Sequence, residues 1–333
     1  MTANLLARAH AAFAATDYAT ALREVERVLA HEPGQLQALS IKANAAIKLD
    51  DADALLEALQ ALHALRPDDA AIRRNLATTL NRRGNRALES GQFARAESEW
   101  RAALAVFPAH REARFNLAGS LRRAGDAQAA LPIYEALDRE APEPAVSLGI
   151  ADCLSDAGRD DDAAARLRAT RITDDLRDSA ISIATRCGAI DVADRLLASV
   201  ESTEARVAAI VGAQRDAMVH RRSAEPLLAR CTDPARLGER SPELQIALTR
   251  AMALPDTLLD AGELDQVRTA FAQGLQDLTR HYDEPRLLRC VPRVAQVVWS
   301  NSLLAYHGRY DRELQGHFGD WLHAALHRFH EAR

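Results

Sequence analysis

The sequence predicts an all-α fold, in which helical hairpins stack into a right-handed α-solenoid and a smaller helical region follows. Four prolines recur at spacings of 34, 41 and 34 residues: Pro33, Pro67, Pro108 and Pro142. A period near 34 is typical of helix–turn–helix repeats. Only 5% of the 333 residues are aromatic, while alanine is abundant and suits close helix packing. Nowhere do β-branched and aromatic residues alternate as in a strand.

Each unit that ends in one of these prolines repeats a pattern of bulky, small and aromatic positions. The third unit carries it most fully, in Leu80, Gly84, Gly91, Phe93, Ala96, Trp100, Ala103, Leu104 and Pro108. We expect small residues where the two helices cross, glycines with positive φ in the turns, and proline at the end of the second helix. The pattern resembles the tetratricopeptide repeat, whose stacked units form a concave surface that binds other chains.

The repeats extend beyond the four prolines. A fifth unit lacks the proline but has Gly158 and Ala163 in register and ends near Asp175, and a sixth, around residues 187–189, is degenerate. The 41-residue spacing places seven extra residues within 69–76, which contains neither Gly nor Pro, so we expect a longer first helix in unit three. Residues 1–200 are therefore predicted to form a solenoid of five to six repeats.

The remaining sequence predicts further helices without a clear repeat. Residues 201–240 read as a degenerate helical pair followed by a linker at 233–241. In the region 241–333, Ser241 and Pro242 are typical of a helix start. Apolar residues at three- and four-residue spacing predict a helix over 263–280 and another within 297–329.

A second resemblance lies in this C-terminal region. Residues 303–315 (LLAYHGRYDRELQ), and more weakly 254–275, are similar to a segment of bacterial SPINDLY and O-GlcNAc-transferase-like glycosyltransferases that contain tetratricopeptide repeats. In that family the segment precedes a nucleotide-sugar domain. The resemblance implies a role in protein glycosylation, with flagellin or another surface protein as client and a glycosyltransferase domain or chain as partner.

The chain as it stands is not predicted to be an enzyme. It ends at Arg333, where the nucleotide-sugar domain would begin, and no strand with a glycine-rich phosphate turn is present in the sequence. We assign no catalytic residue and no cofactor. Asp320, His323 and His327 share one helical face and could hold a metal, but we favour an amphipathic terminal helix and predict no metal site.

Charge and hydropathy exclude two classes of partner. The net charge is −5 with mixed signs, so no nucleic acid is predicted. One local basic cluster, interpreted as a solvated helix face, contains Arg73, Arg74, Arg82, Arg83 and Arg86. No run of about 18 apolar residues or signal-peptide pattern occurs, which predicts no membrane association and a cytoplasmic location. Four scattered cysteines read as thiols in a reducing compartment: Cys153, Cys187, Cys231 and Cys290.

The tetratricopeptide register implies a peptide-binding face on the first helix of each unit. It comprises His10, Phe13, Asn44, Lys48, Asn81, Asn85, Glu89, Phe115, Asn116, Arg122, Arg123 and Asp152. Asn116 occupies the position at which O-GlcNAc transferases carry an asparagine ladder that grips a peptide backbone, a task suited to groups that both donate and accept. The equivalent positions of units two and three hold Ile41 and Arg82, so only one ladder position is matched.

Three functions are consistent with these observations. The first is a protein-binding module that recognises a polypeptide client, as part of a protein glycosylation system. The second is a part of an active O-glycosyltransferase, with residues near Tyr306 and His307 contributing to the sugar site. The third is a stand-alone scaffold unrelated to sugar transfer. Binding of a nucleotide sugar to the isolated chain would distinguish the second from the others.

Overall fold

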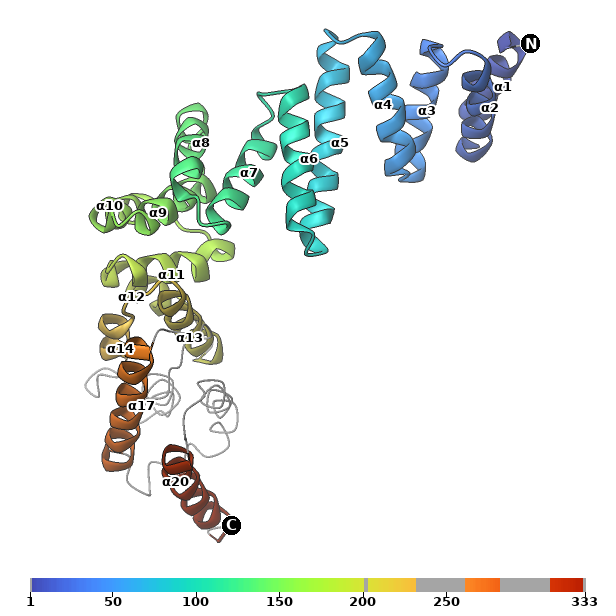
Figure 1. The fold of residues 1–333 in the computed structure, drawn as a ribbon. Coiled ribbons are helices and arrows are strands. Elements are labelled where there is room, and N and C mark those ends of the chain that lie inside the picture. The colour runs from blue at the N-terminus through green and yellow to red at the C-terminus, as the bar shows by residue number, and fades with distance from the viewer. Residues whose placement is uncertain (1, 201–202, 232–260, 282–311, 332–333) are drawn as a thin grey trace. The chain divides into compact units, whose positions relative to one another are not determined.

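The computed structural model describes residues 2–200, 203–231, 261–281 and 312–331, which contain helices and no strands (Figure 1). The all-α prediction is confirmed. The chain divides into two compact units, Met1–Pro142 and Glu143–Arg333. Within the described ranges, no helix is both long and apolar enough to span a lipid bilayer.

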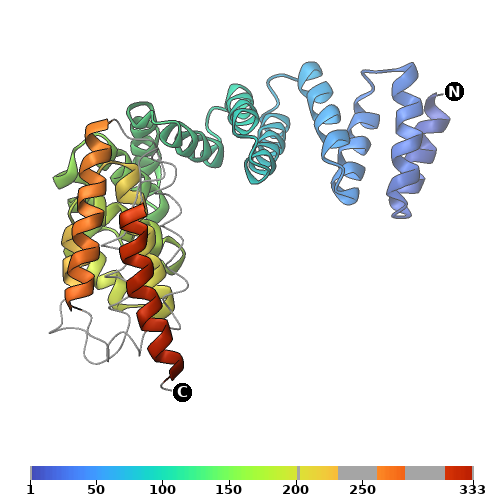
Figure 2. The ribbon, with the colours of Figure 1, turned by 60° about the horizontal axis from the view of Figure 1, so that its bottom comes forward.

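In the first unit, residues 2–142 form four helical hairpins. They are α1 (Thr2–Ala14) with α2 (Tyr18–His31), α3 (Leu36–Leu49) with α4 (Ala52–Leu65), α5 (Ala70–Glu89) with α6 (Phe93–Val106), and α7 (Arg111–Arg123) with α8 (Ala127–Glu140). Each helix contacts the next one along the chain, and Figure 2 shows them following one another in sequence order. We call α1, α3, α5 and α7 the first helices and their partners the second helices.

The helices end near the predicted prolines and turn glycines. Helices α2, α4, α6 and α8 each end two residues before one of the four prolines, because proline lacks an N–H and clashes with the preceding turn. Gly91, Gly125 and Gly158 have φ values of 71°, 86° and 75°, a left-handed conformation that costs glycine little. Asp17 caps α2 by accepting from the Thr20 N–H at 3.0 Å, and hydrogen bonds to Thr20 lower the pKa of the Asp17 carboxyl.

The longer first helix of unit three is also confirmed. Helix α5 has 20 residues, whereas the other helices of residues 2–142 have 13 or 14. Asp69 caps it, and Leu76 in the added turns is buried in the same hydrophobic cluster as Leu59 and Leu62 of α4. The added turns therefore bury apolar surface instead of forming a loop.

Close helix crossings explain the small residues of the pattern. Ala9, Ala21, Ala96, Ala118 and Ala130 are fully buried. A Cβ atom on Gly84 would lie 2.5 Å from Nε1 of Trp100, which is itself buried in α6. Only a residue without a side chain fits there, so the indole of Trp100 sits directly against the backbone of α5.

In the second unit the hairpins continue. They are α9 (Pro144–Asp156) with α10 (Asp160–Ala169), and α11 (Arg177–Arg186) with α12 (Ile190–Ala198). Beyond them, α13 (Thr203–Val219) contacts α11, and α14 (Glu225–Cys231) contacts α12. A short 3-10 turn, η1 (Asp174–Leu176), precedes α11. By the same convention α9 and α11 are first helices, and α13, which contacts α11, is counted with them. Helices α13 and α14 lie within residues 201–240, for which a degenerate helical pair and a linker stay a prediction.

Two further helices are described in the C-terminal region, α17 (Ala261–His281) and α20 (Arg312–Glu331), and they contact each other. Helix α17 corresponds to the predicted 263–280 helix and buries Phe271 and Leu275. The predicted linker at 233–241, the helix start at Ser241, Cys290 and residues 303–311 of the glycosyltransferase-like segment lie outside the described residues. The predicted boundary of the solenoid at residue 200 stays a prediction.

Candidate peptide-binding surface

Three asparagines join the first helices α5 and α7. The Asn116 amide nitrogen donates to the Asn81 and Asn85 carbonyl oxygens at 3.0 and 2.9 Å. The Trp100 indole N–H donates to the same Asn85 oxygen at 3.1 Å. We call Asn81, Asn85 and Asn116 the amide cluster.

Trp100 fixes the orientation of every amide in this cluster. An indole N–H can only donate, so the Asn85 atom that it meets must be the oxygen. That oxygen can only accept, so the Asn116 atom beside it must be the nitrogen, and the Asn81 atom that the nitrogen also reaches must be an oxygen. The assignment follows from the hydrogen-bond network, as it must for amides.

The network leaves hydrogen-bonding groups for a ligand. Asn85 and Asn116 are half-buried, and Asn81 is 7% exposed. Among the described residues, none accepts from the amide nitrogens of Asn81 and Asn85, and none donates to the Asn116 oxygen. The cluster therefore offers donors from α5 beside an acceptor from α7, which is the combination that a peptide C=O and N–H require.

Most other predicted positions of the first unit lie on exposed parts of the first helices. His10, Asn44, Lys48, Glu89 and Arg123 are exposed. Phe13, Phe115 and Arg122 are half-buried. The Phe13 and Phe115 rings stand edge-to-face against Tyr18 and Tyr134, with ring centroids 5.3 and 5.5 Å apart. The two phenylalanines therefore take part in packing each hairpin, and the peptide-binding role of all these residues stays a prediction.

Two predicted positions are not exposed as the register implied. Asn81 is buried because it accepts from Asn116 of the next first helix. Asp152, on α9, is 9% exposed because it pairs with the buried guanidinium of Arg186 on α11. The Asp152 side chain thus lies in the interior of the second unit, and its predicted peptide-binding role stays a prediction.

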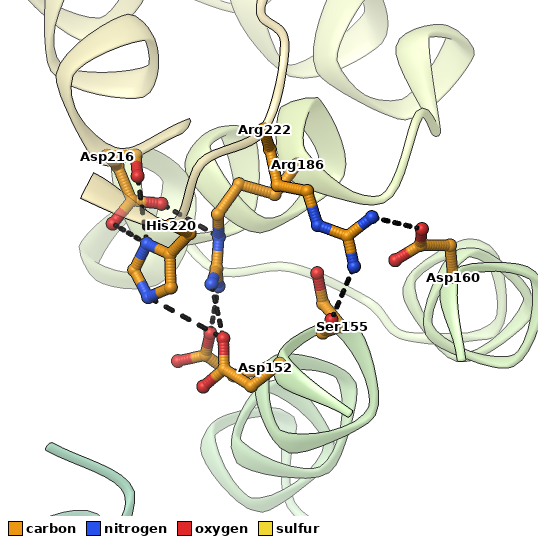
Figure 3. A network of polar contacts seen from close by, with 8 residues as sticks. Asp152, Ser155, Asp160, Arg186, Asp216, His220 and Arg222 are labelled. Carbon is orange, nitrogen blue, oxygen red and sulfur yellow. Dashed lines mark hydrogen bonds and ion pairs between the residues drawn. The ribbon is translucent and has the colours of Figure 1, made fainter. Parts of the chain in front are cut away.

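Arg186 is the centre of a charge network that joins three first helices (Figure 3). Its side chain is 2% exposed and meets Asp152 of α9, Asp156 of α9 at 2.6 Å and Asp216 of α13 at 2.9 Å. Burial lowers the pKa of the Arg186 guanidinium, but the surrounding carboxylates outweigh it, so the net shift is upward. The arginine stays charged and holds α9, α11 and α13 together.

Further polar groups surround this network. His220 lies 3.5 Å from Asp156 and 3.6 Å from Asp216. Arg222 pairs with Asp160 at 3.0 Å and donates to the Ser155 carbonyl at 3.2 Å. Asp160, Asp161 and Asp162 form the first turn of α10, where acids are favoured. The carboxylates of Asp152, Asp156 and Asp216 are thus paired with Arg186, and that of Asp160 with Arg222.

Sequence reasoning missed the roles of Trp100, His110 and Arg186. Trp100 was expected as a packing residue, and it is also a hydrogen-bond donor. His110 is buried at the N-terminus of α7, where Nδ1 accepts from the Ala113 N–H at 3.3 Å and Nε2 lies 3.2 Å from the Thr78 hydroxyl on α5. Arg186 lies 34 residues after Asp152. This separation is close to the repeat length, so the pairing of the two residues could have been predicted from it.

Among the described residues, no group of three His, Cys, Asp or Glu side chains is arranged to hold a metal ion. His323 and His327 have ring centroids 6.2 Å apart, and His327 pairs with Glu331 at 3.4 Å. Cys153 and Cys187 are buried thiols, and burial raises the pKa of Cys187.

Comparison with known proteins identifies the repeats. Two family models, both described as tetratricopeptide repeat, match residues 81–143 and 121–182. No curated protein matches the chain significantly.

Similar solved structures include a tetratricopeptide repeat protein from Parabacteroides merdae ATCC 43184, 14% identical with a TM-score of 0.41, covering 80% of this chain and 98% of that one. MamA is 15% identical with a TM-score of 0.35, over 56% and 93% of the two chains. YrrB, described as a TPR protein with an unusual peptide-binding site, is 12% identical with a TM-score of 0.37, over 59% and 94%. These identities and scores are too low to transfer a ligand. The matched residues, 81–182, consist of tetratricopeptide repeats.

Proposed function

We propose that the first unit binds an extended polypeptide segment across its first helices, and that the amide cluster bonds to the backbone of that segment. The observation that carries this proposal is the set of amide nitrogens of Asn81 and Asn85 and the Asn116 oxygen, to which no described residue bonds, and whose orientation Trp100 fixes. Groups held in place before binding lose little conformational entropy when the ligand arrives. Backbone contacts of this kind tolerate many side chains, so the client is selected by other residues.

Peptide selection and mutagenesis test the proposal. The whole chain is immobilised, peptides of about twelve residues are selected from a random library, and their affinities are measured by fluorescence anisotropy. Asn85→Ala and Asn116→Ala are expected to weaken binding about tenfold each, the equivalent of about one hydrogen bond. Asn75→Ala is the matched control, because Asn75 is exposed on the same helix outside the cluster; its affinity should be unchanged.

Two further measurements separate backbone recognition from other modes. Methylating the backbone nitrogens of a selected peptide removes the N–H groups from which the Asn116 oxygen would accept. Asn116→Ala should then no longer lower the affinity for that peptide. Trp100→Phe removes the donor that orients Asn85 and should weaken binding less than Asn85→Ala. Failure to enrich any peptide, or equal affinities for the Asn75, Asn85 and Asn116 variants, would refute the proposal.

A narrower role in protein glycosylation is a second candidate. It rests on the resemblance of residues 303–315 to a segment of bacterial glycosyltransferases, and the structure describes residues 312–315 of that segment. In this role the chain would bind the client without catalysing the transfer, and a separate glycosyltransferase domain or chain would act on it. Calorimetric titration of the chain with UDP-N-acetylglucosamine tests whether the chain itself contributes to a sugar site. If the sugar nucleotide does not bind, the chain's role in glycosylation is restricted to binding the client protein. If it binds, a role in the sugar-transfer reaction itself is favoured.

A further inference from the structure

Basic and acidic residues are segregated between the two sets of helices in the first unit. The first helices contain one Arg in α1, two Lys in α3, five Arg and one Glu in α5, and four Arg and one Glu in α7, which makes twelve basic and two acidic residues. The second helices contain five basic and nine acidic residues. In a chain of net charge −5, the first helices of this unit thus carry the opposite sign.

Part of this positive charge is neutralised by the second helices. Lys42 pairs with Glu57 at 2.7 Å, Arg83 pairs with Asp53 and Glu99 at 2.6 and 3.2 Å, and Arg114 pairs with Glu140 at 2.6 Å. These arginines and the lysine therefore explain why acids gather on α4, α6 and α8, and they are not available to a ligand.

Four exposed cations on the first helices have no acidic partner among the described residues, and one of them, Arg74, lies over the Phe107 ring with its guanidinium 5.9 Å from the ring centroid. The other three are Lys48 on α3, Arg82 on α5 and Arg123 on α7, and no described residue pairs with any of them. Arg86 is a weaker additional candidate: among the described residues it pairs with Asp50 alone, at 3.6 Å, and both side chains are more than half exposed. Of the basic cluster noted in the sequence, Arg82 is the member without an ion pair, hydrogen bond or ring contact among the described residues.

Two of these three cations, Arg82 and Arg123, lie on the same helices as the amide cluster, and Lys48 lies on the preceding first helix, α3. Arg82 lies between Asn81 and Asn85 in the sequence, and Arg123 lies seven residues, or about two helical turns, after Asn116 on the same side of α7. The negative C-terminal ends of helices favour cations, which accounts in part for Lys48 and Arg123 in the last turns. It does not account for Arg82, two turns before the end of α5.

We propose that the polypeptide segment bound by the first unit is acidic, and that Lys48, Arg82 and Arg123 select it by charge. This inference rests on the proposed function, because the amide cluster supplies the backbone contacts and the cations supply the preference. A polypeptide is favoured over a nucleic acid because bases stack on open aromatic rings, whereas the aromatic residues of these first helices, Phe13 and Phe115, are packed against tyrosines. The second unit lacks the charge segregation, with four basic and five acidic residues on α9, α11 and α13.

Defined peptides test the proposal. Labelled peptides of about twelve residues, alternating Ala with Glu, Gln or Lys, and a single-stranded RNA oligonucleotide are titrated against the whole chain. The Glu peptide is expected to bind about tenfold or more tighter than the Gln peptide at low salt, with the Lys peptide weakest. The difference should shrink as added salt shortens the screening length to a few Å.

Charge reversal locates the preference. The triple variant Lys48→Glu, Arg82→Glu, Arg123→Glu should lose the preference for the Glu peptide and keep its affinity for the Gln peptide. The control Arg23→Glu, Arg95→Glu, Arg139→Glu makes the same change in charge at exposed positions of α2, α6 and α8 and should keep the preference. If the first triple variant unfolds by circular dichroism, the corresponding three Gln substitutions replace it, with an intermediate loss expected.

The outcomes distinguish the two proposals. Equal binding of the Glu and Gln peptides, or loss of the preference in the control variant, overturns the acidic client and leaves the peptide-binding function intact. Tighter binding of RNA than of the Glu peptide also overturns it, in favour of a nucleic acid. If no peptide of any charge binds, and none is enriched from the random library, both proposals fail.

Discussion

First helices in the two units are joined by different chemistry. In the first unit, α5 and α7 meet through neutral amides, and Trp100 fixes the orientation of those amides. In the second unit, α9, α11 and α13 meet through one buried arginine and three aspartates. Both connections bridge successive repeats, and both arise from side chains about one repeat length apart.

The difference shows how the same architecture can be left open or closed to a ligand. An amide has both donors and acceptors, so Asn116 can bond to α5 with its nitrogen and keep its oxygen free. A carboxylate only accepts and a guanidinium only donates, so the Arg186 network is satisfied mainly by its own members. The neutral connection costs little desolvation, whereas the charged one holds only while every partner is present.

The largest effect is expected from Arg186→Ala. Removing the guanidinium leaves Asp152, Asp156 and Asp216 close together without their common partner, and loss of one member of a buried ion network typically costs about 3–5 kcal/mol. Hydrogen exchange of the α11 and α13 amides measures the local stability of the second unit without assuming that the whole chain unfolds in one step. We expect much faster exchange in both helices.

The matched control for this change is Arg195→Ala. Arg195 is exposed on α12, and its removal should alter stability by no more than about 0.5 kcal/mol. If the two variants exchange at similar rates, the charge network does not hold α11 and α13 together, and the contrast between the units loses its basis.

A smaller effect is expected at the α5–α6 crossing in the first unit. In Gly84→Ala the new Cβ would lie 2.5 Å from the Trp100 indole nitrogen, so the helices must separate, at about 1–3 kcal/mol. Gly119→Ala on α7 is the control, because its Cβ would lie 3.4 Å from the Tyr134 hydroxyl and alanine favours a helix by about 0.5–1 kcal/mol. Trp299 and Trp321 are first replaced by Phe, so that Trp100 is the one tryptophan left. Urea unfolding followed by its fluorescence should then show the first variant destabilised and the second close to the parent.

Peptide binding by the same two glycine variants tests whether Trp100 orients the amide cluster. Displacement of Trp100 by Gly84→Ala should also disturb the Asn85 orientation and weaken peptide binding, whereas Gly119→Ala should leave it unchanged. A Gly84→Ala variant that is destabilised and still binds peptides with parental affinity would argue against Trp100 as the residue that orients the amide cluster.

The fold could be predicted from the sequence because its signals are local. The prolines, the turn glycines and the small residues at helix crossings each act within one hairpin, and the extra length of α5 followed from the absence of Gly and Pro in 69–76. The solenoid boundary at residue 200 is not decided by these signals.

The site was harder to predict, because exposure depends on the next repeat. Asn81 and Asp152 occupy register positions that imply an exposed face, and each is buried by a partner one repeat later, Asn116 or Arg186. The partners lie 35 and 34 residues away, so complementary polar residues at about the repeat length are a usable signal. The donor role of Trp100 has no such signal, because its position in the repeat is also explained by packing.

The smallest effect on stability is expected from two similar exposed ion pairs, one in each unit. Arg114 donates to both Glu140 oxygens at 2.6 Å in the first unit, and Arg168 donates to both Asp191 oxygens at 3.0 and 2.8 Å in the second. Hydrogen bonds from these arginines lower the pKa of the Glu140 and Asp191 carboxyls. The two carboxylates are about half exposed, so each pair contributes little.

The sign of the pH dependence follows from the lowered pKa values. In the unfolded chain each carboxyl regains its ordinary pKa of about 4, so below that value the unfolded state binds more protons than the folded state, and stability falls as pH falls through the folded pKa. Glu140→Gln and Asp191→Asn should therefore be slightly less stable than the parent near pH 7 and should converge with it as the pH falls through the folded-state pKa of each carboxyl, as measured by urea unfolding. Because both pairs consist of an arginine and a carboxylate, the two variants should behave alike despite the different connections between first helices. A loss of stability that does not change with pH in either variant would mean that its carboxylate stabilises the helix by something other than charge.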